Sequence, residues 1–321
     1  MGLLAGMPQP HSVSKRKINM NNEQEERYQK ALQLMTDEKW LEASSLLEDL
    51  IDEQPSDDVT KALVLALYRA KQYARAFVYF AEQAEVFTGD KGHARLAVHL
   101  LLHNQSYIAA RLFITDLPLD WQDEFETLIA EAEQTAEEKF QTTIQTALRS
   151  FYHLGDCPLN EQQERLGAAR QLPLKEYLTG AQFLLRDPYA HQLIKAALVD
   201  TLRQLGVDQQ MALRWLDARE YTINPAKLSA IEELPVVQEL HRELADRLAN
   251  HNPSEYQLAG QELQMQLMLL YPLIEEKVTD PAGWVNCLIG RIRGAASEAQ
   301  PAILAVQRQL GQVIDDLGEK P

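Results

Sequence analysis

Large apolar residues, aromatic residues and alanines recur with a constant spacing along the first third of the chain. At three places an aromatic residue stands three positions before an alanine, and a large apolar residue follows that alanine by four. The three sets are Trp40, Ala43 and Leu47; Tyr73, Ala76 and Phe80; and Tyr107, Ala110 and Ile114. Their aromatic residues are 33 and then 34 residues apart. A fixed period of this size predicts stacked supersecondary units, each too small to bury a core alone.

Each unit has the pattern of a helix, a short turn and a second helix. In the first unit, Tyr28 and Ala31 belong to the apolar stripe of one helix, and polar turn residues follow at 37–39. A second helix is expected at 41–51, and Pro55 stands beyond its end. The alanines have a steric role, because two helices cross closely only where one presents a small side chain. The aromatic residue of each set is expected to fill the space beside that crossing.

Residues 25–118 resemble the tetratricopeptide repeat (TPR) family, and the three sets above carry the resemblance. It implies an all-α fold: a right-handed superhelix of antiparallel helix pairs. In that family the first helices of the pairs line a concave groove, which holds a peptide or a partner helix. The small residue usual in the middle of the first helix is Ala31 in the first unit, but Val64 and Val98 in the next two. The helix crossing angles are therefore expected to differ from the family average.

The period fades after residue 118, and four segments are expected. They are a flexible tail at 1–21, three TPR-like repeats at 22–118, a long capping or connecting helix at 119–156, and a C-terminal helical region at 157–321. Residues 120–153 contain no proline or glycine and are interpreted as one long helix with a solvated acidic face. That face comprises Glu124, Glu126, Glu131, Glu133, Glu137 and Glu138. Residues 155–158, Gly-Asp-Cys-Pro, break the helix and mark a domain boundary.

The C-terminal region combines helical patterns with one short alternating segment. Helices are expected at 189–205, 235–250, 254–275, 280–295 and 298–317. Alternating apolar and polar residues predict a small β-hairpin at 211–224. TPR units followed by helices and one hairpin look like a group of uncharacterised bacterial TPR proteins. Tyr189, His191 and Lys195 are expected on one face of the 189–205 helix, either in a contact between repeats or in a second binding surface.

The family resemblance places ten residues in the groove. They are Tyr28, Leu32, Met35, Lys61, Leu65, Tyr68, Arg69, Arg95, His99 and His103. Three of them are cations in an otherwise acidic chain, and cations beside an apolar floor suit a peptide with Asp, Glu or a free carboxylate. The alternative interpretation is an ordinary solvated helix face. Leu65 stands where TPR proteins that clamp a carboxylate have an asparagine, which argues against that particular clamp.

Composition narrows the choice of partners. The chain has 321 residues and a formal net charge of −16. A strongly acidic surface repels nucleic acid and anionic membranes, so neither is an expected partner. The most apolar helical pattern, 258–274, contains Gln261, Glu262, Gln264 and Gln266, which does not fit a membrane span. Only two cysteines occur, far apart, which favours a cytoplasmic location over a disulfide-bonded framework.

Candidate chemistry is sparse. His99 and His103 are four positions apart on one helix, a spacing that suits two metal ligands, but no third ligand is evident. Cys157 follows His153 by four, yet a nucleophilic cysteine also needs an oriented base. No phosphate-binding glycine loop or nucleophile elbow is found. We therefore expect no catalytic residues, no metal and no cofactor.

The favoured function is a cytoplasmic, non-catalytic adaptor whose groove binds an acidic peptide or a partner helix. Two alternatives stay open. One is an intracellular sensor that binds a signalling peptide and relays the change through the C-terminal region, and the other is an enzyme. A homo-oligomer is compatible with the sequence.

Overall fold

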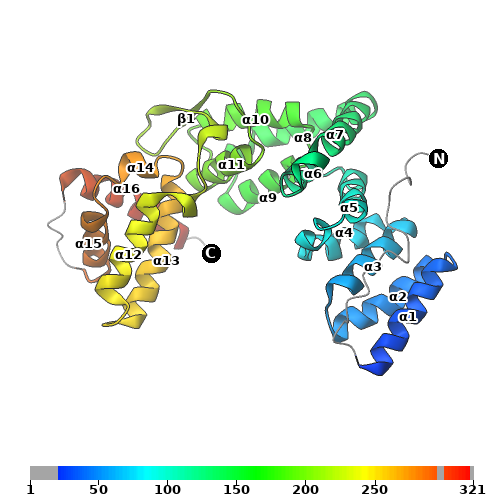
Figure 1. The fold of residues 1–321 in the computed structure, drawn as a ribbon. Helices are drawn as coiled ribbons and strands as arrows, with labels where there is room; N and C mark the ends of the chain where they lie inside the picture. The colour runs from blue at the N-terminus through cyan, green and yellow to red at the C-terminus, as the bar shows by residue number, and fades with distance from the viewer. Residues whose placement is uncertain (1–20, 295–299, 319–321) are drawn as a thin grey trace. The chain divides into compact units, whose positions relative to one another are not determined.

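The computed structural model describes residues 21–294 and 300–318. Within them the chain forms sixteen α-helices, four short 3-10 helices labelled η2 to η5, and one two-stranded sheet (Figure 1). The predicted all-α fold with one small hairpin is therefore confirmed. The predicted tail lies outside the described residues, except for Asn21. The chain divides into two compact units: unit 1 contains the chain up to Ser150 and Gly167–Leu178, and unit 2 contains Phe151–Leu166 and the chain from Thr179.

The helices of unit 1 pack in the order of the chain. Their bounds are α1 Asn22–Thr36, α2 Trp40–Glu53, α3 Asp57–Arg69, α4 Tyr73–Glu82, η2 Ala84–Phe87, α5 Lys91–His103, α6 Tyr107–Thr115, α7 Leu119–Lys139 and α8 Gln141–Tyr152, whose end belongs to unit 2. Each helix from α1 to α6 contacts the next one. The first helices of successive pairs also contact each other, α1 with α3, α3 with α5 and α5 with α7. The first helices thus follow one another directly through unit 1.

The turn inside each of the first three helix pairs has the same backbone conformation. Glu38, Lys71 and Gln105 have positive φ angles of 60°, 61° and 56°. In each turn an amide donates to the carbonyl five positions earlier: Lys39 N to Leu34 O at 2.8 Å, Gln72 N to Leu67 O at 2.9 Å, and Ser106 N to Leu101 O at 2.9 Å. This is the Schellman closure of a helix C-terminus. Its recurrence shows that the sequence period is also a period of the backbone.

The first helix of each pair begins at a polar cap. The side chains of Asn21, Ser56 and Asp90 accept hydrogen bonds from the backbone amides of Gln24, Val59 and His93, at 2.9, 3.4 and 3.0 Å. Each bond satisfies one of the free amides at a helix N-terminus. The second helices begin directly after the turn, without a side-chain cap.

The alanines of the three sets are fully buried, as the steric argument requires. These are Ala43, Ala76 and Ala110. Beside them Tyr107 is buried, while Trp40 and Tyr73 are partly exposed. The first two aromatic residues therefore keep part of their surface available to solvent.

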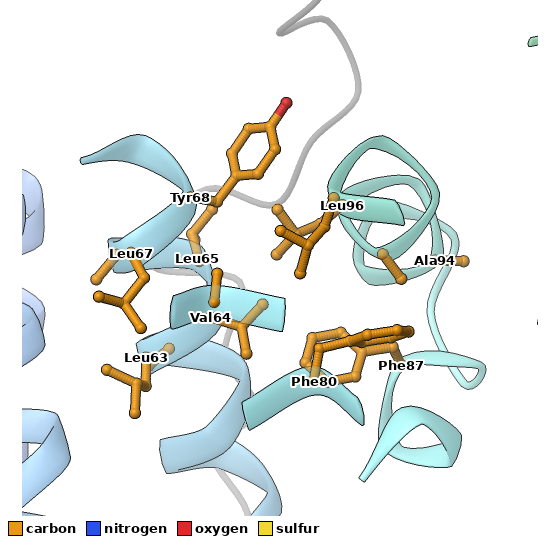
Figure 2. Close-up of a cluster of buried hydrophobic side chains, with 14 of the residues drawn as sticks. Leu63, Val64, Leu65, Leu67, Tyr68, Phe80, Phe87, Ala94 and Leu96 are labelled. Atoms are coloured by element: carbon orange, nitrogen blue, oxygen red, sulfur yellow. The ribbon is translucent and has the colours of Figure 1, made fainter. Parts of the chain in front are cut away.

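The core of unit 1 centres on α3. Every residue from Ala62 to Tyr68 is buried, because α3 contacts α1, α2, α4 and α5. Figure 2 shows Val64 on the side of α3 that faces Leu96 of α5 and the rings of Phe80 and Phe87, while Leu63 and Leu67 point to the opposite side of the helix. Lys61 and Arg69 flank this buried run, so the best-packed helix of the unit holds a partly exposed cation on each side of its buried stretch.

The segment predicted as one long helix is two helices. α7 ends at Lys139 and α8 begins at Gln141, because Phe140 leaves the helical conformation with φ −122° and ψ 26°. The lack of proline and glycine permits a long helix but does not impose one. α8 restarts its own apolar stripe with Ile144 and Leu148, which are buried.

The acidic face predicted for this segment also needs correction. Glu133 is buried, and its carboxylate accepts two hydrogen bonds from Arg111 at 3.0 and 2.8 Å. It also accepts the backbone amide of Leu174 at 3.1 Å. This bond, and one from Ile108 N to Arg170 O at 3.1 Å, explain why Gly167–Leu178 belongs to unit 1. The predicted boundary at 155–158 thus lies a few residues after the division at Ser150.

Unit 2 continues the chain with shorter elements and the hairpin. Its elements after α8 are η3 Leu154–Asp156, α9 Leu159–Ala169, α10 Leu174–Arg186, α11 Gln192–Gln204, β1 Met211–Arg214, β2 Glu220–Ile223, η4 Pro225–Lys227, η5 Ile231–Glu233, α12 Pro235–Leu248, α13 Pro253–Leu270, α14 Ile274–Lys277, α15 Pro281–Ile292 and α16 Pro301–Gly318. The last residues of α9 and the first of α10 belong to unit 1. α11 begins three residues later than predicted, because His191 caps it by accepting the amide of Leu193 at 3.2 Å.

The predicted hairpin is present, with Met211 opposite Ile223 and Arg214 opposite Glu220. Its two aromatic residues differ in exposure, since Tyr221 is partly exposed and Trp215 packs inward. Trp215 is buried and donates its indole N–H to Leu269 O at 3.1 Å.

Candidate functional site

The ten predicted groove residues all lie on the first helices α1, α3 and α5. Five of them are buried: Tyr28, Met35, Leu65, Tyr68 and His99. These five side chains are part of the core, and they leave little apolar surface for a ligand. The accessible part of the set is Leu32, Lys61, Arg69, Arg95 and His103.

Lys61, in the second turn of α3, and Arg69, its last residue, are partly exposed cations, and neither has an ion pair with a described residue. The Arg69 guanidinium carbon lies 5.8 Å from the ring centroid of Trp40, which is a cation–π contact. This contact holds the arginine in place without neutralising its charge. The terminal nitrogens of Arg69 and the ammonium of Lys61 are therefore suited to bind carboxylates.

Arg95 differs from these two cations. It forms an ion pair with Glu124 of α7, and Lys91 joins the same carboxylate at 2.8 Å. The hydrogen bonds of Lys91 and Arg95 lower the pKa of Glu124. Glu124 was expected on a solvated face. It instead neutralises Arg95, the third cation of the predicted groove.

An aromatic group stands beside Arg69. The rings of Tyr73 and His103 are stacked with centroids 4.0 Å apart and an interplanar angle of 4°. Tyr68 meets both rings edge-on, with centroids at 5.2 Å and 5.5 Å. Figure 2 shows the Tyr68 hydroxyl pointing away from the buried cluster. Sequence reasoning gave Tyr73 only a packing role, yet it joins two predicted groove residues. Tyr73 follows Lys71, the residue of the turn that ends α3, by two positions, and this turn brings it back against Tyr68. The turn was the sequence signal that could have placed Tyr73 beside the groove.

The pKa shifts of Tyr68, His99 and His103 favour the neutral form of each side chain. Burial raises the pKa of Tyr68 to about 12. The stacked Tyr73 ring covers one face of His103, and this partial burial lowers the pKa of His103. Burial lowers the pKa of His99 to about 4, with smaller contributions from His103 and Arg95. Both imidazoles are therefore neutral at pH 7, and the positive charge of this surface comes from Lys61 and Arg69.

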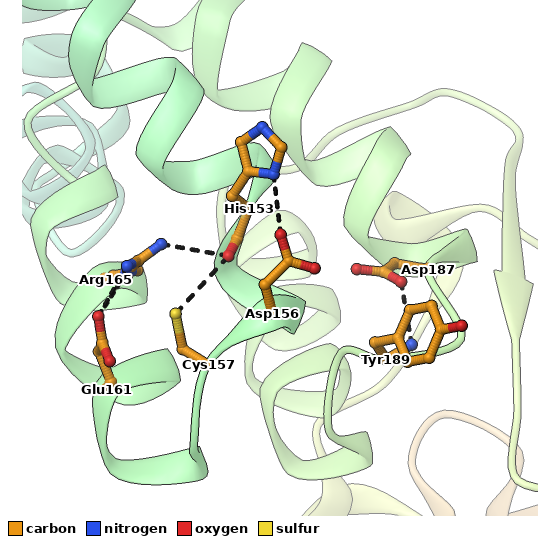
Figure 3. A network of polar contacts seen from close by, with 7 residues as sticks. All are labelled: His153, Asp156, Cys157, Glu161, Arg165, Asp187 and Tyr189. Carbon is orange, nitrogen blue, oxygen red and sulfur yellow. Dashed lines mark hydrogen bonds and ion pairs between the residues drawn. The ribbon is translucent and has the colours of Figure 1, made fainter.

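The second chemical candidate, Cys157, does not contact the imidazole of His153. Its thiol contacts the backbone oxygen of His153 at 3.8 Å, while the His153 ring binds Asp156 at 2.9 Å (Figure 3). Burial raises the pKa of the Cys157 thiol, and a hydrogen bond with Glu161 adds to this effect. A raised pKa disfavours the thiolate that nucleophilic attack requires.

The described residues include no group of three or more histidine, cysteine or acidic side chains placed to hold a metal ion. None of the helices in that part of the chain is both long and apolar enough to cross a bilayer. A scan against models of protein families, a search of curated proteins and a search of solved structures each gave no match.

Proposed function

We propose that unit 1 is a non-catalytic protein-binding module, with a surface made by Lys61, Arg69, Trp40, Tyr73 and His103. We call this surface the α3 face. The observation that carries the proposal is that the two cations on α3 are not neutralised. In a chain with a net charge of −16, Lys61 and Arg69 have no acidic partner among the described residues.

The arginines of neighbouring helices provide the contrast. Arg27 is paired with Glu53, Arg75 with Glu48, and Arg111 with Glu133. Acidic side chains are thus abundant in unit 1 and neutralise most of its arginines. Two unpaired cations on one helix, one of them beside an aromatic group, favour a surface for an acidic partner, as in TPR proteins that hold peptides.

The spacing of the two cations narrows the partner. Lys61 and Arg69 are eight residues apart on α3, a rise of about 12 Å. An extended peptide covers about 12 Å in roughly four residues. We therefore propose an extended segment with two acidic side chains about four positions apart, and with an aromatic or apolar residue that contacts Tyr73 and His103.

The test is binding of a display library of acidic peptides to the full chain. We expect enrichment of peptides with Asp or Glu about four positions apart. The double variant Lys61→Glu/Arg69→Glu should weaken the binding of enriched peptides by at least about tenfold, and added salt should also weaken it. The matched control is Lys39→Glu/Lys71→Glu, which reverses two exposed cations in the turns of the same unit.

Circular dichroism and thermal melting show whether each variant remains folded. Equal binding by both double variants, or enrichment of peptides without paired acidic residues, would contradict the proposal. A pull-down from cytosol with the same three proteins then identifies physiological partners, which should be lost only with Lys61→Glu/Arg69→Glu.

A further inference from the structure

Unit 2 contains a cavity of about 830 Å³ that lies apart from the α3 face in the chain. It is lined by the N-terminal ends of α9 and α11, by the loop before each helix, and by single residues of the hairpin turn and α16. Ligand cavities are commonly about 300–1,000 Å³ in size. The volume therefore suits a small organic molecule.

The lining carries no acidic or basic side chain apart from His191. Three carboxylates lie near it in the chain, and each is already bound (Figure 3). Asp156 binds His153 at 2.9 Å, Glu161 binds Arg165 at 2.7 Å, and Asp187 accepts the amide of Tyr189 at 2.9 Å. A chain of high negative charge thus has a cavity without a carboxylate in its lining.

Gln162 connects the two chain segments that line the cavity. It is buried, and its amide oxygen accepts the backbone N–H of His191 at 3.0 Å while its amide nitrogen donates to Cys157 O at 2.8 Å. One side chain of α9 therefore fixes both the start of α11 and the loop before α9.

Gln192, the first residue of α11, has a side-chain amide that takes no part in these hydrogen bonds. This residue lines the cavity, only 4% of it is exposed, and its amide nitrogen has no hydrogen-bond partner among the described residues. A buried donor without a partner is unfavourable in the folded protein. A ligand that brings an acceptor oxygen into the cavity removes this penalty.

The two helices also determine the preferred charge of the ligand. α9 has 11 residues and α11 has 13, and both direct their N-terminal ends at the cavity. A helix N-terminus carries partial positive charge and favours an anion.

We propose that this cavity binds a small carboxylic acid with an aromatic or apolar body. The carboxylate would accept a hydrogen bond from Gln192 between the two helix N-termini. Leu216 and Val313 supply apolar lining, and Tyr189 stands at the cavity with 74% of its surface exposed, free to cover an aromatic body. This ligand site is additional to the protein-binding function proposed for unit 1.

The experiment uses the full chain with phenylacetate as the probe and phenylacetamide as its neutral counterpart, in calorimetric titration and thermal melting. We expect phenylacetate to bind at millimolar concentration or below and to raise Tm. Phenylacetamide should bind at least about tenfold more weakly, because it lacks the charge that the helix ends favour.

Gln192→Leu is the decisive variant. Its amide nitrogen has no partner to lose, so the variant should melt at or above the wild-type temperature while its affinity for phenylacetate falls at least about tenfold. Gln204→Leu, at the exposed end of the same helix, is the control and should bind like wild type. Absence of phenylacetate binding to the wild type, equal binding of the amide, or unchanged affinity of Gln192→Leu would each overturn the proposal.

Discussion

The two units are held together in different ways. In unit 1, side-chain ion pairs connect a helix to the next one or two helices along the chain, as Arg75 of α4 does with Glu48 of α2. In unit 2, hydrogen bonds connect segments that are distant in sequence. Trp215 donates to Leu269 O, 54 residues later, and Lys277 donates to the Tyr221 hydroxyl at 2.6 Å. A repeat needs only its neighbours, whereas unit 2 needs particular side chains from far along the chain.

The hairpin of unit 2 shows the consequence. A two-stranded sheet alone is marginally stable in water. Lys195 of α11 donates to Arg214 O at 2.8 Å, and Lys277 lies 4.8 Å from the Trp215 ring centroid. Two lysines and one tryptophan thus attach the hairpin to the helices around it. We expect loss of such a contact to affect the whole of unit 2, while changes in unit 1 remain local.

The largest effect is expected at the buried ion pair of Arg111 and Glu133 in unit 1. Burial alone would lower the pKa of Arg111, but its hydrogen bonds and the charges of Glu133 and Glu126 raise it. Arg111→Met leaves the Glu133 carboxylate buried without its cation. Such a change costs about 3 to 5 kcal/mol of unfolding free energy, measurable by urea denaturation followed by circular dichroism.

Two variants test whether this cost comes from the uncompensated charge. Arg111→Met/Glu133→Gln removes both charges, keeps an acceptor for the amide of Leu174, and should recover most of the loss. Arg75→Met breaks the pair with Glu48, in which the arginine side chain is half exposed, and should cost less than about 1 kcal/mol. Equal losses from Arg75→Met and Arg111→Met would show that burial does not distinguish the two pairs.

The repeated half of the fold was predictable because its contacts are local. The aromatic and alanine positions determined three helix pairs, and the structure has equivalent turns at Glu38, Lys71 and Gln105. The hairpin was predictable for a similar reason, since alternation and a turn are both local signals. The break at Phe140 was not, because no residue there forbids a helix and packing decides where it ends.

The candidate site was predictable only in part. Periodicity put Lys61 and Arg69 on the correct helix, but it could not show that Leu65 and Tyr68 are covered by neighbouring helices. Nor could it show that Glu124, 29 residues away, neutralises Arg95. The cavity at Gln192 depends on two helix starts that meet only in the folded chain, and no spacing in the sequence indicates it.

An intermediate effect is expected from Lys195, the buried cation of unit 2. Burial lowers its pKa to about 8, with a smaller opposing effect of Asp187. Below pH 8 the lysine is charged in both the folded and the unfolded chain, and the folded state bears the full desolvation penalty. Between pH 8 and the unfolded pKa of about 10.4, only the unfolded chain holds the proton, so wild-type stability rises with pH relative to Lys195→Met.

The expected gain is on the order of 3 kcal/mol across that interval. Urea midpoints of wild type and Lys195→Met at several pH values measure it as a difference between the two proteins. Lys227→Met removes an exposed lysine from η4 and serves as the control. We expect its difference from wild type to stay constant with pH. A Lys195→Met difference that is equally constant would mean that the buried lysine keeps its proton.

The smallest effect tests the equivalence of the three turns in unit 1. Glu38, Lys71 and Gln105 have left-handed backbone conformations that non-glycine residues adopt at a cost, so each glycine substitution should stabilise the protein by about 0.5 to 1 kcal/mol. The sites are far apart in the chain, and the gains should therefore add in the triple variant. Lys39→Gly is the control, because Lys39 has a φ of −83° and gains nothing from glycine. Ala218→Gly makes the same exchange in the hairpin of unit 2, where φ is 60°. Three similar gains in unfolding free energy in unit 1 would show that the three turns are energetically equivalent. A gain at only one of the three sites would show that the turns share a backbone conformation but not its energetic cost.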